Sequence, residues 1–199
     1  MYITEAFKEK DRARIIALAN EFAFASLITI NEGVPSASHL PLLIESGEKT
    51  IILGHMAKLN EQWKDLQEDN EVLVIFQGPH AYISPSIYEG FAVPTWNYTA
   101  IHMYGTAKVV KKTKLKKIIN SLTDKYEKEQ ETPWNPKYPE RMLDAIVGFE
   151  IVVNRIEAKF KLSQNREEGD RKNIIINLNK SGTESEIALA KIMEENELQ

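Results

Sequence analysis

The chain has 199 residues, and 25 Lys and Arg against 29 Asp and Glu give it a formal net charge of −4. Its composition, 43% hydrophobic and 27% charged, is that of a globular protein, and the length suits one domain. The absence of cysteine excludes disulfides, thiolate chemistry and cysteine-ligated metal centres. There is no apolar run of the roughly 20 residues that span a bilayer, and residues 1–5 lack a signal-peptide pattern. We therefore expect a cytoplasmic protein without a membrane partner.

The first part of the chain predicts one helix and a series of short strands. Apolar residues near helical spacing indicate a helix over residues 8–23. The next helix is expected over residues 60–68, where Asn60 can cap it. Between the helices, turn signals around Gly33 and Gly47 separate three β-type segments, at residues 26–30, 37–44 and 50–53.

The second part predicts further strands with helices at its edges. A helical stripe runs from Leu115 to Tyr126, and Pro139 is expected to begin a short helix through Ile146, after a loop marked by Pro133 and Pro136. A last helix is expected over about 184–196. Strands are predicted over residues 72–76, 81–83, 98–110, 147–155 and 157–162. The Gly78-Pro79 step is expected to break the chain between the first two, and the last two are expected to pair with each other. The fold class expected is α+β, a single domain over residues 1–199 built as a mostly antiparallel β-barrel with peripheral helices.

Charge is distributed unevenly along the chain. The 36 residues from Val72 to Ala107 carry a single formal charge, Glu89, together with seven aromatic residues. A buried strand pair would explain the low charge, but the polar residues in this window, such as Gln77, His80 and Asn97, would need partners in a core. An apolar region with a few placed polar groups is typical of a small-molecule site.

Three segments are candidate ligand contacts. Residues 54–60 combine a glycine with His55 and Lys58 before a predicted helix, which suits a phosphate, although an ordinary strand–helix connection is the simpler interpretation. In residues 93–98, Trp96 and Tyr98 could stack on a planar ring. Residues 161–166 form a polar cluster that could close over an anionic or heterocyclic ligand, or be merely solvated.

Two further groups have weaker functional interpretations. The four histidines, at positions 39, 55, 80 and 102, match no local metal-ligand spacing, and we expect no metal site. Six lysines between positions 108 and 117 could contact DNA phosphates, but a solvated helix face is favoured, because the same helix soon becomes acidic. No helix-turn-helix signature accompanies them.

Several longer strings occur in an order that resembles one family. They are Met1-Tyr2-Ile3 with Phe7, Ser38-His39-Leu40-Pro41-Leu42-Leu43, residues 54–63 (GHMAKLNEQW), residues 76–85 (FQGPHAYISP), residues 93–98 (VPTWNY), His102-Met103-Tyr104-Gly105, residues 147–151 (VGFEI), residues 161–166 (KLSQNR) and Asp170-Arg171. Across roughly residues 1–178 the chain resembles the PaiB-type FMN-binding negative transcriptional regulators.

The resemblance implies an FMN-binding split β-barrel, similar to the pyridoxamine 5′-phosphate oxidase superfamily, in which two subunits form a homodimer and FMN lies at their interface. The implied phosphate loop is His55, Ala57 and Lys58, with Asn60 and Gln62 nearby, and the strand beginning Ser38, His39 and Leu40 would lie along the isoalloxazine. The implied flavin-facing residues are Gln77, His80, Tyr82, Ser84, Trp96 and Asn97, and the segment that completes the cleft supplies Lys161, Gln164, Asn165 and Arg166. Many superfamily oxidases place paired arginines at the phosphate, where this chain has His55 and Lys58.

The resemblance implies an FMN-binding transcriptional regulator, a repressor that affects sporulation and degradative-enzyme genes. The alternative is an FMN-dependent oxidoreductase, a small reductase or oxidase with Tyr82, His80 and His102 as candidate proton donors. A flavin- or metabolite-sensing dimer without catalysis is a third interpretation. DNA as a direct partner has little support from the acidic net charge.

Overall fold

The computed structural model describes residues 1–66, 70–134 and 139–198, and places them in two compact units. Unit 1 consists of residues 1–15, 77–101 and 157–199, and unit 2 of residues 16–76 and 102–156. The single-domain organisation over residues 1–199 remains a prediction. In the described part of the chain, no helix combines the length and apolar character needed to cross a membrane.

Within the described residues, seven strands form one sheet in the order β2-β1-β5-β6-β7-β4-β3. Every strand pair with a defined register is antiparallel, which confirms the α+β class with a largely antiparallel sheet. The strands are β1 (Phe24–Asn31), β2 (Val34–Pro41), β3 (Leu43–Ser46), β4 (Thr50–Ala57), β5 (Glu71–Ile83), β6 (Thr95–Val109) and β7 (Ile146–Lys161).

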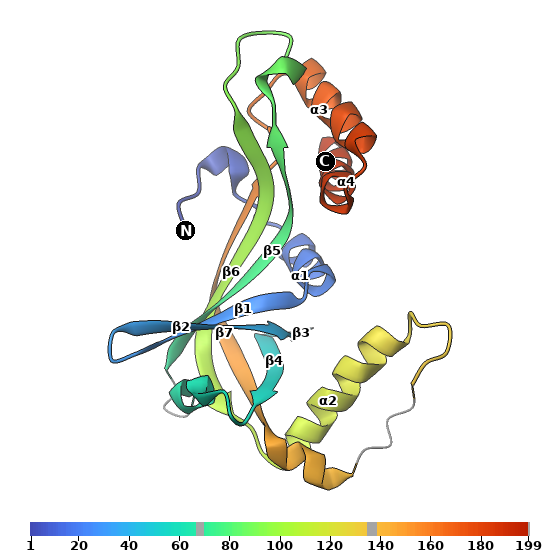
Figure 1. The fold of residues 1–199 in the computed structure, drawn as a ribbon. Helices are drawn as coiled ribbons and strands as arrows, with labels where there is room; N and C mark the ends of the chain where they lie inside the picture. Colours follow the sequence, from blue (N-terminus) through green and yellow to red (C-terminus); the bar gives the residue numbers. More distant parts are fainter. Residues whose placement is uncertain (67–69, 135–138, 199) are drawn as a thin grey trace. The chain divides into compact units, whose positions relative to one another are not determined.

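The described residues also form α-helices and short 3-10 helices, labelled in Figure 1 where there is room. The α-helices are α1 (Arg12–Glu21), α2 (Lys112–Glu127), α3 (Glu168–Ser181) and α4 (Glu184–Glu197). The 3-10 helices are η1 (Glu5–Phe7), η2 (Glu61–Leu66), η3 (Pro85–Ile87) and η4 (Glu140–Ala145). In unit 1, α3 and α4 pack against each other.

Local sequence signals explain several elements directly. Glu32 and Gly33 both have positive φ, 49° and 82°, and form the two-residue turn of the β1–β2 hairpin. The predicted stripe on α2 is buried at Leu115, Ile118 and Leu122, and the last two pack with Leu53 of β4 in the core of unit 2. The last helix, α4, lies where it was predicted.

Other expectations about the strands were wrong. Strand β5 does not break at Gly78-Pro79 but continues to Ile83, and proline is tolerated there because only residues 73–75 pair with β1. The two strands predicted at 147–155 and 157–162 are instead one long strand, β7, which runs from residue 146 to 161. The segment predicted as a single strand over 37–44 divides into β2 and β3.

The helical expectations also needed correction. Helix α3 was missed, although its C-terminus carries a glycine in the left-handed conformation, Gly182, with a φ of 83°. The helix expected over 60–68 is the short 3-10 helix η2, and its predicted end at Glu68 lies outside the described residues. Pro139 precedes η4 as its N-cap instead of being its first residue, and Pro136 lies outside the described residues.

Candidate functional site

The residues predicted to contact a cofactor fall into two groups, because eight belong to unit 2 and ten to unit 1. The group in unit 2 lies on β2, on the end of β4 and on the connection to η2. The group in unit 1 lies on β5, on β6 and around the end of β7.

The glycine of the phosphate candidate has a packing role instead of approaching a ligand. Gly54 lies within β4, and a Cβ atom there would come within 2.5 Å of both Leu42 and Phe149 side chains. His55 follows on the opposite face of the strand, the face that carries Leu53. Gly54 is therefore required by the packing of β4 against Leu42 and Phe149, which agrees with the simpler interpretation of an ordinary strand–helix connection.

The connection after β4 is held by hydrogen bonds from its own backbone. The N–H of Lys58 donates to the carbonyl of Ala145 at 2.8 Å, and the N–H of Asn60 donates to that of Ala57 at 2.9 Å. The N–H of Gln62, at the start of η2, donates to Asn60 Oδ1 at 3.2 Å. These three donors are therefore engaged within the protein, and the phosphate contact predicted at this connection remains a prediction.

Side chains tie this connection to the β1–β2 hairpin. Asn60 Nδ2 donates to Ser38 Oγ at 2.7 Å. Gln62 is only 5% exposed, and its Nε2 lies 3.1 Å from the carbonyl oxygens of both Leu27 and Ser36. Asn60 and Gln62 thus position the connection, while the exposed Lys58 and Ala57 remain at its surface.

Two histidines of this group differ in their surroundings. His39 Nδ1 lies 2.9 Å from Ser26 Oγ, its cross-strand neighbour in β1. Burial lowers the pKa of His55, and its Nδ1 has no hydrogen-bond partner among the described residues. Burial thus disfavours the charged form of His55 and leaves a buried ring nitrogen without a hydrogen bond in the described residues.

Strand β2, which carries Ser38, His39 and Leu40, lies at the edge of the sheet. Its residues 34–41 pair with β1 on one side only, and most are exposed. An edge strand has backbone groups that are not used by a neighbouring strand. The backbone hydrogen bonds predicted for this strand are therefore compatible with its position.

In unit 1, three aromatic side chains from β5 and β6 form a cluster. The ring centroid of Trp96 lies 6.1 Å from that of His80 and 6.0 Å from that of Tyr82, with a T-shaped arrangement for the second pair. Trp96 is 52% exposed and Tyr82 48% exposed, so these faces are open to solvent. Trp96 was expected in a loop, but β6 begins at Thr95 and holds it in a strand.

Lys161, at the end of β7, lies beside this cluster. Its ammonium donates to the Trp96 carbonyl at 2.6 Å and also to Thr95 Oγ1. Burial lowers the pKa of Lys161, and the positive charges of Lys159 and Arg166 lower it further. The Arg166 guanidinium lies 4.9 Å from the ring centre of Tyr88.

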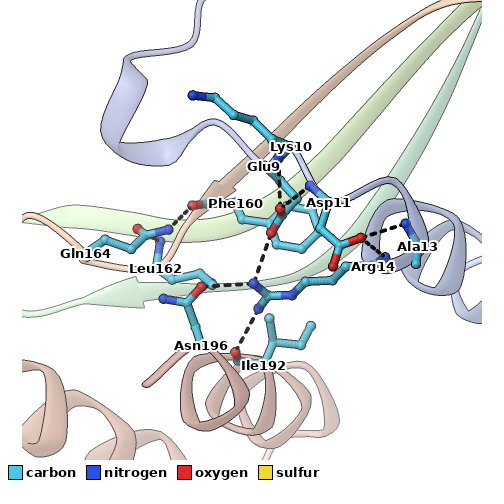
Figure 2. Close-up of polar contacts among 10 residues, drawn as sticks. All are labelled: Glu9, Lys10, Asp11, Ala13, Arg14, Phe160, Leu162, Gln164, Ile192 and Asn196. Atoms are coloured by element: carbon cyan, nitrogen blue, oxygen red, sulfur yellow. Dashed lines mark hydrogen bonds and ion pairs between the residues drawn. The ribbon is translucent and has the colours of Figure 1, made fainter. Parts of the chain in front are cut away.

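Other predicted residues face inward or serve local turns. Asn97 is fully buried, and its amide exchanges two hydrogen bonds with Ser163 Oγ, at 2.9 and 3.1 Å. Gln164 folds back onto β7, where its Nε2 donates to the Phe160 carbonyl at 2.6 Å (Figure 2). The Ser84 hydroxyl accepts from the N–H of Ser86 and caps η3, and Gln77 and Asn165 are exposed. The side chains of Asn97 and Gln164 are therefore engaged within unit 1, and their contact with a cofactor remains a prediction.

Sequence reasoning missed an ionic anchor in unit 1. Figure 2 shows Arg14, at the start of α1, whose guanidinium bonds to Glu9 Oε2 and Asn196 Oδ1, both at 3.0 Å. The same group lies 5.1 Å from the ring centre of Phe160 and donates to the Ile192 carbonyl near the C-terminus of α4. These partners are up to 182 residues away in the sequence, so local patterns could not reveal them.

The predicted basic stretch in unit 2 is largely neutralised. Four of its six lysines form ion pairs: Lys108 and Lys114 with Glu150, Lys112 with Asp144, and Lys116 with Glu140. Lys111 and Lys117 form no ion pair with any described residue. These ion pairs favour the interpretation of the lysines as a solvated face over the interpretation as a basic patch that contacts DNA.

Comparison with known proteins then decides the family. Residues 1–155 match the family model described as "Putative FMN-binding domain". The protease synthase and sporulation protein PAI 2 of Bacillus subtilis is 41% identical over 201 residues, covering 98% of this chain and 97% of that protein. The chain belongs to the PaiB-type FMN-binding family.

Solved structures support the same fold at low sequence identity. The FAD- and heme-binding protein of Mycobacterium smegmatis has a TM-score of 0.65 at 12% identity, with 83% of this chain and 78% of that chain covered. The flavocytochrome Anf3 of Azotobacter vinelandii has a TM-score of 0.63 at 12% identity, covering 86% and 78%. The family's cofactor is a flavin, FMN, as predicted.

Proposed function

We propose that the protein is a cytoplasmic FMN-binding regulator of protease synthesis and sporulation that works as a homodimer. The observation that carries the proposal is the match to the Bacillus subtilis sporulation protein, which extends over 98% of the chain. Because the match includes α3 and α4 beyond the FMN-binding region, the regulatory role is proposed for the whole chain as one functional domain.

In this proposal the FMN phosphate is held by residues of unit 2. His55 offers a buried ring nitrogen without a partner, and Lys58 offers an exposed ammonium that forms no ion pair with any described residue. The edge strand with Ser38, His39 and Leu40 offers backbone groups to the ring system. These donors fit an anionic, heteroatom-rich cofactor.

We also propose that the predicted residues of unit 1, considered within that unit, contact flavin. Trp96, Tyr82 and His80 offer exposed ring faces, with Lys161 beside them. The remaining members are Gln77, Ser84, Asn165 and Arg166 at the surface, supported from inside by Asn97 and Gln164. When bound, FMN would supply hydride and electron transfer, which side chains alone do not provide.

We infer that regulation does not depend on the lysines of 108–117 contacting DNA. Four of these six lysines already have carboxylate partners, and the net charge of the chain is −4. Nucleic-acid affinity depends mainly on free positive charge opposite phosphates. Changing the two remaining lysines, in K111Q/K117Q, is therefore expected to leave any retention of promoter DNA at low salt unchanged. A clear loss of retention would contradict this inference.

An FMN-dependent oxidoreductase is the second candidate. The exposed aromatic cluster of unit 1, together with Lys161, favours it because such a surface can hold a second ligand. Anaerobic NAD(P)H should then reduce bound FMN, as followed by loss of flavin absorbance. A flavin that stays oxidised would contradict the oxidoreductase candidate and favour a regulator that catalyses no reaction.

Titration of the apo-protein with FMN tests the cofactor site. We expect quenching of flavin fluorescence and a raised melting temperature, with K58Q weakening FMN binding about tenfold, as expected for losing one charge-assisted hydrogen bond. The matched control is K64Q, because Lys64 lies on η2 nearby but pairs with Glu61 at the surface. Equal affinity in K58Q and K64Q would place the phosphate elsewhere.

A further inference from the structure

Helices α3 and α4 of unit 1 carry an apolar groove with a volume of about 360 Å³. We call it the α3–α4 groove, and its lining residues are Lys172, Ile175, Ile176, Glu194, Glu197 and Leu198. Ile176 is 51% exposed and Leu198 is 88% exposed. Apolar side chains of the groove are therefore open to solvent within this unit.

The groove does not belong to the interior of unit 1. Ile174 and Leu178, one turn apart on α3, are almost completely buried and so share the inward face of that helix. Ile176 lies midway between them in the sequence and, at about 3.6 residues per turn, is on the opposite side of the helix. Packing within unit 1 thus uses one face of α3, and the groove is a second apolar surface.

The groove is also separate from the residues proposed to contact flavin. None of its lining residues is among the predicted cofactor contacts. Both helices follow residues 1–155, the part of the chain that matches the FMN-binding family model. An exposed apolar surface rimmed by polar residues is typical of a binding site for another macromolecule. The charges beside the groove then indicate the kind of partner.

Negative charge predominates at the end of α4. The last turn of this helix holds Glu194, Glu195 and Glu197 and no basic residue, although a helix C-terminus favours cations. Glu197 is paired with Arg171. Glu194 accepts a hydrogen bond from the neutral amide of Asn179, and neither Glu194 nor Glu195 forms an ion pair with a described residue. Two exposed carboxylates are therefore left without a cation in the described part of the chain.

This charge decides between the classes of partner. Lys172, the cation of the groove itself, already pairs with Glu168. Nucleic acids, anionic lipids and fatty acids would bring further negative charge to Glu194 and Glu195, and like charges repel. A second copy of the chain, related by a twofold axis, would place the same acidic surface against itself. A positively charged partner with apolar side chains fits both the groove and its rim.

We propose that the α3–α4 groove binds a basic amphipathic helix of a partner protein. Apolar side chains one turn apart on that helix would lie against Ile175, Ile176 and Leu198, and flanking Lys or Arg residues would pair with Glu194 and Glu195. The open walls suit a helix lying across them better than a small molecule, which a pocket usually encloses. The proposal goes beyond the proposed function and does not depend on flavin binding.

Fluorescence anisotropy of two labelled peptides, titrated with the full-length protein, tests the groove. Both peptides have about 18 residues, enough to form a helix, and the same leucine stripe. One carries lysine on its polar face and the other glutamate. We expect saturable binding of the leucine–lysine peptide and at least tenfold weaker binding of the leucine–glutamate peptide.

Variants of the protein locate the binding surface. I176D and L198D place a charge in the groove and should each weaken binding of the leucine–lysine peptide about tenfold or more. The matched control is I187D, because Ile187 is a similarly exposed isoleucine of α4 that does not line the groove. Binding to I187D should equal binding to the wild type. Equal affinities of I176D and I187D would overturn the proposal.

A second pair of variants tests the acidic rim. E194Q/E195Q should weaken binding of the leucine–lysine peptide about threefold to tenfold, as expected for charges at the edge of an interface. The control E184Q removes the same charge at the other end of α4 and should change binding less. Equal binding of the two peptides by the wild type, or no saturable binding of either, would overturn the proposal.

Sedimentation velocity distinguishes a partner helix from a second copy of this chain. We expect I176D and the wild type to sediment as the same species and to retain the same ratio of flavin to protein absorbance. A smaller species for I176D would assign the groove to self-association and overturn the proposal. Failure of the wild type to bind FMN would contradict the proposed function alone, because the peptide titration does not require flavin.

Discussion

The hydroxyl of Ser185 bonds to both backbone groups of His80: it donates to the carbonyl at 2.7 Å and accepts from the N–H at 3.0 Å. A side chain of α4 thereby takes the place of a neighbouring strand at this residue of β5. The pairing of β5 with β1 involves only residues 73–75, so Ser185 satisfies backbone groups that lie beyond it.

Replacing this hydroxyl should destabilise unit 1. We expect S185A to lower the free energy of unfolding by about 1–2 kcal/mol, because two backbone groups lose their partner. Denaturant unfolding followed by circular dichroism measures the change, with S46A at the exposed end of β3 as the control. A change in S185A no larger than in S46A would mean that water replaces the hydroxyl at no cost.

Arg14 should be more sensitive than its neighbour Lys10. R14A removes an ion pair with Glu9, two further hydrogen bonds and the stacking on Phe160, and we expect a loss of about 2–3 kcal/mol. K10A breaks an exposed ion pair with Glu5, which solvent screens, and should destabilise the protein much less than R14A. Thermal melts of both variants test the comparison, and equal losses would contradict the role of Arg14 as an anchor.

Glu150 should make the stability of unit 2 depend on acidic pH. Burial raises its pKa, but hydrogen bonds and charges from Lys108 and Lys114 outweigh burial, so the pKa is lowered overall. A carboxylate with a depressed folded pKa contributes stability above its unfolded pKa, near 4.5, and the contribution is lost as the pH falls through the folded value.

Denaturant unfolding between pH 3 and pH 6 tests this expectation. E150Q should flatten the loss of stability below about pH 4.5, because its side chain does not titrate. The control E140Q changes an exposed partner of Lys116 and should alter the profile less. Parallel profiles for wild type and E150Q would show that other carboxylates cause the acid dependence.

Two glycines should not tolerate a methyl group. In G105A the new Cβ would meet the backbone carbonyl of Val152, and in G54A it would meet the Leu42 and Phe149 side chains. Since side chains adjust more easily than backbone, we expect losses of about 1–3 kcal/mol for G54A and more for G105A. G90A, which meets nothing within 4 Å, is the control. A G105A variant as stable as G90A would contradict the close approach of β6 and β7.

Local patterns predicted the elements whose signals are contained in neighbouring residues. The α2 stripe of Leu115, Ile118 and Leu122 and the turn at Glu32-Gly33 are examples, because helical spacing and positive φ are local properties. The strand breaks predicted at Gly78-Pro79 and between residues 155 and 157 were wrong. Where a strand ends depends on which neighbouring strands pair with it, and this is not a local property of the sequence.

For the candidate site, the sequence identified the regions but did not reveal the roles. Residues 93–98 and 161–166 do lie next to each other, as the contact of Lys161 with Trp96 shows. The side chains of Asn97 and Gln164, however, turn inward, and Lys159, which no motif singled out, has no carboxylate partner among the described residues.

The sequence by itself determined the family, the flavin cofactor, the α+β class and the low-charge aromatic stretch, because these are carried by composition and by ordered strings of residues. Only the tertiary structure decided which charges meet: Lys108 and Lys114 find Glu150, whereas Lys159 and Lys161 find no acid in the described part of the chain. Partners such as these are 36 or more residues apart, and their distance depends on how the strands associate. The net charge of −4 therefore conceals both a lysine stretch that is largely paired with carboxylates and two lysines without an acidic partner among the described residues.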